Sequence, residues 1–245
     1  MSQLANSVMT LHAFLLPQER NVKTLDLPRP SKCSLWIPAT DMDWQDNGLP
    51  QRRSTHRYWL AVWNDAEDAD LFMANAVQFF AAMADAKDAW HAKLLPYMHR
   101  GALHWDELSS PPNVFDGFHA KPAADCPILV MTTVKRRSEV DKATLFGNTV
   151  TDVRSTLQKA DGLLVEMLML TLDFERFDGG TLTLWKNEAS AVKWAYQGQA
   201  HKHAMELDKE RDLMERSSFA RFAIEKSIGT WNGAEPLAGL SLGGV

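Results

Sequence analysis

A chain of 245 residues is long enough for one large domain or for two of about 100–120 residues, and either can bury a hydrophobic core. Hydrophobic residues make up 45% of the chain and charged residues 23%, which is the composition of an ordinary globular protein. The formal net charge of −5 argues against nucleic acid or an anionic membrane surface as a partner.

The two cysteines, Cys33 and Cys126, form no CxxC pair, which fits a reducing compartment and argues against a disulfide framework or a structural zinc site. The N-terminal stretch lacks the basic region of a signal peptide. The longest apolar run, Leu163–Leu172, is too short to span a bilayer. We therefore expect a cytoplasmic protein without a transmembrane segment. Nine tryptophans and eleven methionines suggest a pocket with wide, polarizable apolar walls.

The first half of the chain has four strand candidates, which are LHAFLL (11–16), CSLWI (33–37), RYWLAVW (57–63) and GALHW (101–105). The stretch from Ala66 to about Tyr97 is predicted to be helical. A further helix is hard to place between the first two strands, because this region is interrupted by prolines. A Pro- and Gly-containing segment, Pro111–Pro127, then marks a boundary. We divide the chain into an N-terminal half (1–112), a linker (113–126) and a C-terminal half (127–245).

The second half is more regular. Its predicted elements begin with a strand over 127–136, a helix from 138 to about 159, and strands over 163–174 and 181–185. They continue with a helix from 187 or 188 to about 196, a helical piece over about 201–216, and a strand over 219–228. A break at Gly198 separates the last two helical pieces from each other. The order β-α-β-β-α-β is that of the ferredoxin-like unit.

The two halves repeat a pattern. RYWLAVWNDAEDADLF (57–72) and GTLTLWKNEASAVKW (180–194) each contain a strand that ends in Trp, a polar pair and the start of a helix. Trp63 aligns with Trp185, and Ala69 with Ala191, at one offset of 122 residues. RGALHW (100–105) resembles IGTWNG (228–233) in the same order. The sequence therefore predicts an α+β fold of two tandem ferredoxin-like halves, the first degenerate, packed as the pseudo-dimer of a dimeric α+β barrel.

Thr181–Gly233 resembles the C-terminal region of the spheroidene monooxygenase family of carotenoid-pathway enzymes. The matching features are the Trp-ended strand, Ala195-Tyr196, a His after the break, Asp212, the block FARF (219–222) and a final Gly-x-Trp-x-Gly. The first half joins more weakly through YWLAVWND and AWHAKLLPYMHRGALHW. This family is related to the dimeric α+β barrel proteins, which include haem-binding oxygenases, haem-binding dehydratases and cofactor-free monooxygenases.

The resemblance implies a haem b whose iron is held by His201, an apolar pocket and monooxygenase activity. An axial His needs a neutral ring nitrogen facing the cavity and a hydrogen bond on its other nitrogen. Helix geometry places Met205 on the face of His201, whereas His203 points away and is expected to be solvated. Trp194 and Tyr196 would line the cofactor pocket, and Arg221 would bind a propionate. For each of these side chains, a core or surface role is the alternative.

The sequence contains no HExxH, P-loop or GxGxxG motif and no clear nucleophile–base pair, so a cofactor would have to supply the chemistry. The expected partners are a hydrophobic small-molecule substrate and an electron donor or peroxide. Three alternatives stay open: a cofactor-free monooxygenase of the same fold, a haem-dependent dehydratase, and a non-catalytic protein that carries haem or an apolar ligand. A homodimer is an alternative to the monomer.

Overall fold

The structure is a computed structural model, and it describes residues 7–44, 50–101, 115–172 and 179–242. Its strands are β1 (Val8–Leu15), β2 (Cys33–Trp44), β3 (Pro50–Trp63), β4 (Asp88–Gly101), β5 (Ile128–Arg136), β6 (Leu163–Thr171), β7 (Gly179–Trp185) and β8 (Met214–Gly229). Its α-helices are α1 (Ala66–Ala74), α2 (Ala76–Phe79), α3 (Val140–Leu157), α4 (Glu188–Gln197) and α5 (Gln199–Arg211). Short 3-10 helices cover Val22–Leu25 and Ala81–Met83. No helix in these ranges is long and apolar enough to cross a membrane.

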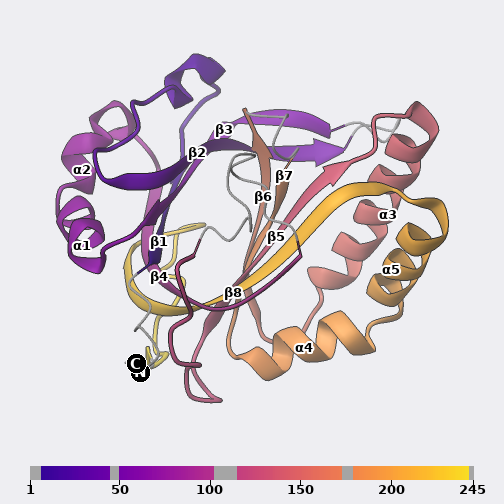
Figure 1. Ribbon diagram of the computed structural model, residues 1–245. Coiled ribbons are helices and arrows are strands. Elements are labelled where there is room, and N and C mark those ends of the chain that lie inside the picture. The colour runs from indigo at the N-terminus through magenta and orange to yellow at the C-terminus, as the bar shows by residue number, and fades with distance from the viewer. Residues whose placement is uncertain (1–6, 45–49, 102–114, 173–178, 243–245) are drawn as a thin grey trace.

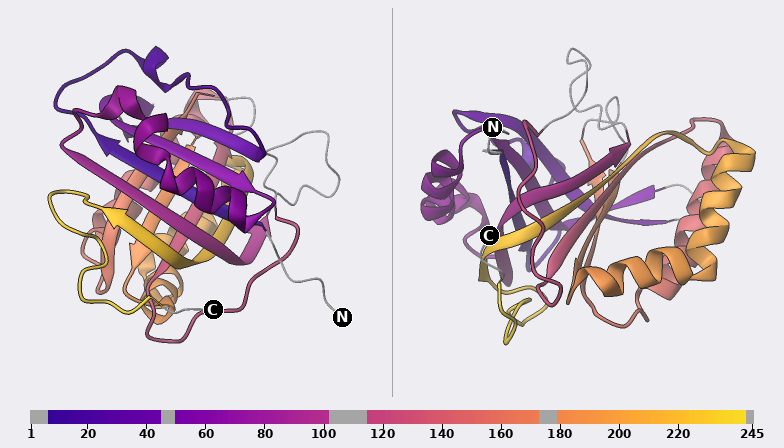
Figure 2. Two further views of the ribbon diagram at one scale, coloured as in Figure 1. Left: turned by 90° about the vertical axis from the view of Figure 1, so that its left-hand side faces the viewer. Right: turned by 60° about the horizontal axis from the view of Figure 1, so that its bottom comes forward.

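The eight strands close into one antiparallel barrel in the order β1-β3-β2-β6-β7-β5-β8-β4. Helices α1 and α2 cover one side of this barrel, and α3, α4 and α5 cover the opposite side (Figures 1 and 2). Two seams join the halves of the chain. The β4–β8 seam pairs residues along the length of both strands, whereas the β2–β6 seam pairs Ala39 with Thr171 and Thr40 with Leu170.

Each half contributes four strands in the same spatial order, second-third-first-fourth. In the second half α3 connects the first two strands, as the sequence predicts. In the first half the corresponding connection holds the 3-10 helix Val22–Leu25, in the region where prolines make a helix hard to predict. Within the described residues, the first half therefore has a 3-10 helix at the place where the second half has α3.

The repeated sequence pattern occupies corresponding places in the two halves. Trp63 ends β3 opposite Val8 of β1, and Trp185 ends β7 opposite Ile128 of β5. A polar N-cap then starts each helix: the Asp65 carboxylate accepts a hydrogen bond from the Glu67 amide, and the Asn187 side chain accepts one from the Ser190 amide. The sequence echo therefore has a structural counterpart.

The second repeated pattern, RGALHW (100–105) and IGTWNG (228–233), also has a structural counterpart at the residues that the structure describes. Gly101 ends β4 and Gly229 ends β8, both with positive φ, +86° and +95°. A Cβ built on Gly101 would lie 2.3 Å from the Ser217 carbonyl oxygen, and one on Gly229 would lie 1.9 Å from that of Ala89. Both positions need glycine for the left-handed backbone and for the close approach of the paired strand. Residues 102–105 of the predicted strand GALHW lie outside the described residues.

The barrel interior is packed with side chains that alternate along the strands, so it is a core and not a channel. On β4, for example, Trp90, Ala92 and Leu94 are buried in this inner cluster. The strands' other faces meet the helices, where separate apolar clusters form.

One predicted element is wrong. The sequence predicts a helix to about Tyr97, but helical structure ends near Met83, and Asp88–Gly101 is β4. This strand lies between β1 and β8 and is buried on both faces over Asp88–Pro96, so its apolar run lacks a clear alternation. Pro96 stands at a register shift between β4 and β8, where a missing amide is tolerated.

The second-half elements are confirmed, with the largest shift of boundary between α5 and β8; residues 173–174 of the predicted strand 163–174 lie outside the described residues. The last helical piece ends at Arg211 rather than near Arg216, and β8 already begins at Met214. Asp212 takes a left-handed conformation (φ 54°), which terminates α5. The Asp208 carboxylate accepts hydrogen bonds from the amides of Leu213 and Met214 and so fixes the turn into β8.

Candidate functional site

A cavity of about 440 Å³ lies between the outer face of strands β5–β8 and the three helices α3, α4 and α5. Most of its wall is apolar, and the apolar lining residues include Val130, Val134, Phe146, Val150, Val153, Leu157, Leu168, Leu170, Trp185, Trp194, Met205, Met214 and Phe219. A concave, largely apolar space with a few polar groups is the usual form of a small-molecule site. The strand register and the α4–α5 junction decide which polar groups face it.

The floor of the cavity, which we define as the outer face of β5–β8, is set by strand register. Phe219, Thr132, Thr181 and Leu168 form one row across β8, β5, β7 and β6. The next row holds Arg221, Val130, Thr183 and Glu166. All eight residues line the cavity. Because these side chains come from four strands, single-sequence patterns did not indicate them as a set.

The roof of the cavity includes the junction of α4 and α5. Gly198 takes an extended conformation between the two helices and interrupts the helical hydrogen bonding. The Gly198 amide still donates to the Trp194 carbonyl, and the carbonyls after Trp194 in the last turn of α4 need partners from outside the helix. The His201 Nδ1 atom, in the first turn of α5, lies 2.8 Å from the Ala195 carbonyl oxygen and satisfies it.

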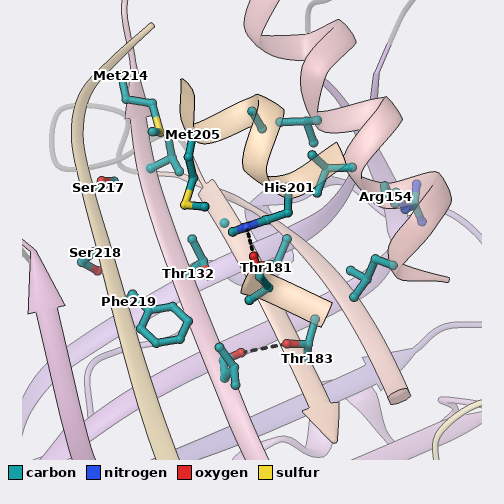
Figure 3. Close-up of a pocket in the computed structure, with 18 of the residues that line it drawn as sticks. Thr132, Arg154, Thr181, Thr183, His201, Met205, Met214, Ser217, Ser218 and Phe219 are labelled. Atoms are coloured by element: carbon teal, nitrogen blue, oxygen red, sulfur yellow. Dashed lines mark hydrogen bonds between the residues drawn. The ribbon is translucent and has the colours of Figure 1, made fainter. Parts of the chain in front are cut away.

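This hydrogen bond determines which ring nitrogen of His201 carries the proton. A carbonyl oxygen accepts, so Nδ1 carries the proton and donates, and Nε2 of the neutral ring keeps its lone pair. Burial lowers the pKa of His201, with the Ala195 hydrogen bond acting in the opposite direction. The nearby N-terminus of α5 also disfavours an imidazolium. In Figure 3 the ring extends from α5 into the cavity. His201 thus presents a neutral ring on the cavity wall.

The structure brings the predicted site residues together. Trp194, Tyr196, Met205 and Arg221 line the same cavity as His201. The Trp194 ring centroid lies 5.0 Å from that of His201, and the indole Nε1 atom is buried without a hydrogen-bond partner among the described residues. Tyr196 and Met205 are 47% and 44% exposed, so they form the outer edge of the cavity. His203 is exposed, as predicted.

Arg221 has its own carboxylate partner. Its Nη1 atom donates a hydrogen bond to Glu188 Oε1, and the Lys121 ammonium pairs with Glu188 Oε2. These two cations hold the pKa of Glu188 below its usual value, against the opposing effect of burial. The guanidinium also lies 5.2 Å from the Phe219 ring centroid, and its Nε atom is buried with no hydrogen-bond partner in the part of the chain that the structure describes. Arg221 therefore keeps one unsatisfied donor beside the cavity wall.

The corresponding space in the first half is filled. Between α1, α2 and the outer face of β1, β3 and β4, aromatic rings pack around two buried histidines; the rings are Phe14, Trp59, Phe72 and Phe80. His12 Nδ1 lies 2.8 Å from His91 Nδ1, and His12 Nε2 lies 3.0 Å from Thr10 Oγ1. Sequence patterns do not indicate this pair, because β1 and β4 are far apart in the chain.

The His12–His91 pair makes folding sensitive to acid. Burial lowers the pKa of His91 to about 4, and burial together with the charge of His91 holds the pKa of His12 well below its ordinary value. The unfolded chain therefore binds protons before the folded one as pH falls below about 6.5. Above that pH the free energy of unfolding keeps its full value. Between pH 6.5 and 5.0, protonation of this pair in the unfolded chain should lower the free energy of unfolding by about 3 kcal/mol.

Urea unfolding at both pH values measures this loss. His91→Phe keeps a ring among its aromatic neighbours and should remove about half of the pair's contribution, whereas exposed His203→Ala should leave the loss unchanged. Equal pH dependence in all three proteins would contradict the assignment.

Within the described residues, no three His, Cys, Asp or Glu side chains lie close enough to hold a metal ion by themselves.

The barrel and its flanking helices place the chain in the dimeric α+β barrel fold class. Two solved structures share this fold at 10% sequence identity. An aldoxime dehydratase matches over 94% of this chain and 85% of its own, with a TM-score of 0.58. An aldoxime dehydratase in complex with butyraldoxime matches over 91% of this chain and 81% of its own, with a TM-score of 0.57. No protein-family model and no curated protein matches the sequence.

Proposed function

We propose that the protein is a haem-dependent oxidoreductase that acts on a hydrophobic small molecule, with His201 as the iron ligand and oxygen transfer as the reaction. The observation that carries this proposal is the state of His201. Its Nδ1–H is held by the Ala195 carbonyl, and its neutral ring lies on the wall of an apolar cavity. These are the two conditions that an axial histidine must meet.

The cavity residues fit a haem. The apolar wall suits the porphyrin faces, and Trp194 beside His201 would pack against the ring system. Trp194 Nε1 and Arg221 Nε are buried donors that no described residue satisfies, and polar groups on a bound molecule would satisfy them. A haem propionate is one such group, and Tyr196 and Met205 would cover the exposed edge.

Bound haem would supply the one-electron and O2 chemistry that the side chains lack. His201 would hold the iron, with the Ala195 carbonyl fixing the ring orientation and the proton on Nδ1. The apolar residues of α3 would exclude water and favour a hydrophobic substrate. Oxygen transfer would also need an electron donor or a peroxide as co-reactant.

Dehydration of an aldoxime is the second candidate. The observation that favours it is the fold shared with aldoxime dehydratases, at TM-scores of 0.57 and 0.58. The sequence resemblance to the spheroidene monooxygenase family favours oxygen transfer. An aldoxime such as butyraldoxime, assayed beside an apolar substrate with O2 and reductant, would separate the two reactions.

We also propose that the chain is a pseudo-dimer of two ferredoxin-like halves, with the linker at 113–126. The common strand order, the two N-capped helices after Trp63 and Trp185, and the glycine pair Gly101 and Gly229 support this duplication. One half then keeps an open cavity while the aromatic side chains of the other fill the equivalent space.

An absorption spectrum tests the haem proposal. Protein produced with a haem precursor should show a Soret band at about 400 nm and visible bands that shift when dithionite is added. A colourless protein that also fails to take up added haemin would overturn the proposal. It would favour a cofactor-free monooxygenase of this fold, and retention of haem without turnover would favour a binding protein.

A further inference from the structure

The cavity floor carries two hydroxyl groups at its centre. Thr132 of β5 and Thr181 of β7 are directly paired across the strands, and both line the cavity. Their row is completed by Phe219 on one side and Leu168 on the other, so the two hydroxyls lie between apolar side chains. In Figure 3 both threonines lie on strands toward which the His201 ring extends.

These hydroxyls differ from the other threonines of the cavity. The Thr183 hydroxyl donates toward the Val130 carbonyl oxygen at 3.5 Å and accepts from the Trp185 indole at 2.9 Å. The Thr149 hydroxyl donates to the Leu145 carbonyl in α3. In the described part of the chain, the Thr132 and Thr181 hydroxyls have no such protein partner. Their hydrogen-bonding capacity is therefore available to a ligand.

The chemistry of this pair indicates which ligand it would bind. Two neutral hydroxyls can donate to one acceptor oxygen or exchange hydrogen bonds with a hydroxyl. The nearest charged residues on the floor, Arg221 and Glu166, stand in the next row, and each has an ion-pair partner: Glu188 for Arg221 and Arg154 for Glu166. An ionised group would gain little compensation between Phe219 and Leu168, because neutral hydroxyls repay only part of its desolvation cost. An uncharged oxygen suits the site better.

We propose that Thr132 and Thr181 form a binding subsite for an uncharged carbonyl or hydroxyl oxygen of the hydrophobic ligand, and that they are specificity-determining residues for it. This inference rests on the part of the proposed function that makes the cavity the ligand site, and it does not require haem. The two threonines would hold the oxygen-bearing end of the ligand on the floor, across the cavity from α5.

Two ligands of equal shape test the subsite. 2-Acetylnaphthalene carries a carbonyl oxygen, and 2-isopropenylnaphthalene carries a CH2 group in its place. Equilibrium dialysis gives a dissociation constant for each ligand. The ratio of the two constants is compared between a variant and the unchanged protein, because the ligands' different costs of leaving water are the same for both proteins and cancel in that comparison. In Thr132→Val/Thr181→Val this ratio should shift about tenfold against the ketone, and in each single variant about threefold, since each variant removes a hydrogen bond and keeps the side-chain shape.

Thr149→Val is the matched control, because it removes a hydroxyl from the same cavity that is already bonded to the helix backbone. It should leave the ratio unchanged. A shift below twofold in the double variant, or an equal shift in Thr149→Val, would overturn the subsite. If the double variant does not fold, the two single variants decide.

The measurement is made on protein with and without added haemin, so that failures of the two proposals are distinguishable. A shifted ratio in protein that takes up no haem would leave the subsite standing while the haem proposal fails. Normal haem uptake with an unshifted ratio would overturn the subsite alone.

Discussion

Replacing His201 with alanine should weaken haem binding by roughly 100-fold or more and remove most of the Soret absorption at equal protein concentration. Loss of a group that merely orients a ligating histidine costs about 10–100-fold in metal affinity, so loss of the ligand itself should cost at least as much. The His201 side chain is only partly buried, on the wall of the cavity, so its truncation leaves the barrel core intact. Haemin titration followed by absorption measures the change.

Two control experiments test whether this loss of haem binding is specific to the His201 ring. Added imidazole should restore the Soret band in His201→Ala, because the truncated side chain leaves space for a free ring in the cavity. His203→Ala, two residues further along α5 and exposed to solvent, should bind haem as the unchanged protein does. Full haem occupancy in His201→Ala would contradict the assignment and leave His201 as the residue that satisfies the Ala195 carbonyl.

Local sequence patterns predict the second half of the fold well. Strand β5, helix α3 and the Gly198 break were all indicated by residues within a few positions of each element. His201, Trp194 and Met205 were found as neighbours because they lie on adjacent helices within one short segment. Spacing along one helix is information that a single sequence contains.

What the sequence could not provide depends on pairing between distant strands. The strand β4 was predicted as a helix because burial on both faces removes the alternation by which strands are recognised. The His12–His91 contact and the Thr132–Thr181 pair each depend on a register between strands that single-sequence patterns do not specify. The single closed barrel likewise depends on the short β2–β6 seam.

The two spaces between the sheet and its helices differ in content: the second half has an open cavity, and the corresponding space in the first half is filled by aromatic side chains. Register places Thr132 opposite Phe219 in the second half and His12 opposite His91 in the first. In the first half these two side chains hydrogen-bond to each other under Phe72 and Phe80, so the sheet and helices pack directly. In the second half the helices stand off the sheet and leave space for a ligand.

Gly229→Ala should destabilise the barrel by about 3–4 kcal/mol, measured as the loss in the free energy of unfolding by urea with far-UV circular dichroism. Gly229 has φ +95°, and its added Cβ would lie 1.9 Å from the Ala89 carbonyl oxygen of the paired strand. That oxygen also accepts a hydrogen bond from the Thr230 amide at 3.0 Å. Because backbone cannot yield as a flexible side chain can, relief of the clash must open the end of the β4–β8 seam.

Gly233→Ala separates the clash from the backbone strain. Gly233 also has a positive φ, +77°, but a Cβ at this position would meet no atom within 4 Å. This variant should therefore lose only about 1 kcal/mol, the usual cost of a left-handed backbone for alanine. Equal losses in Gly229→Ala and Gly233→Ala would show that strain alone sets the cost, and that the close approach of β4 and β8 at Gly229 contributes nothing to the joining of the two halves.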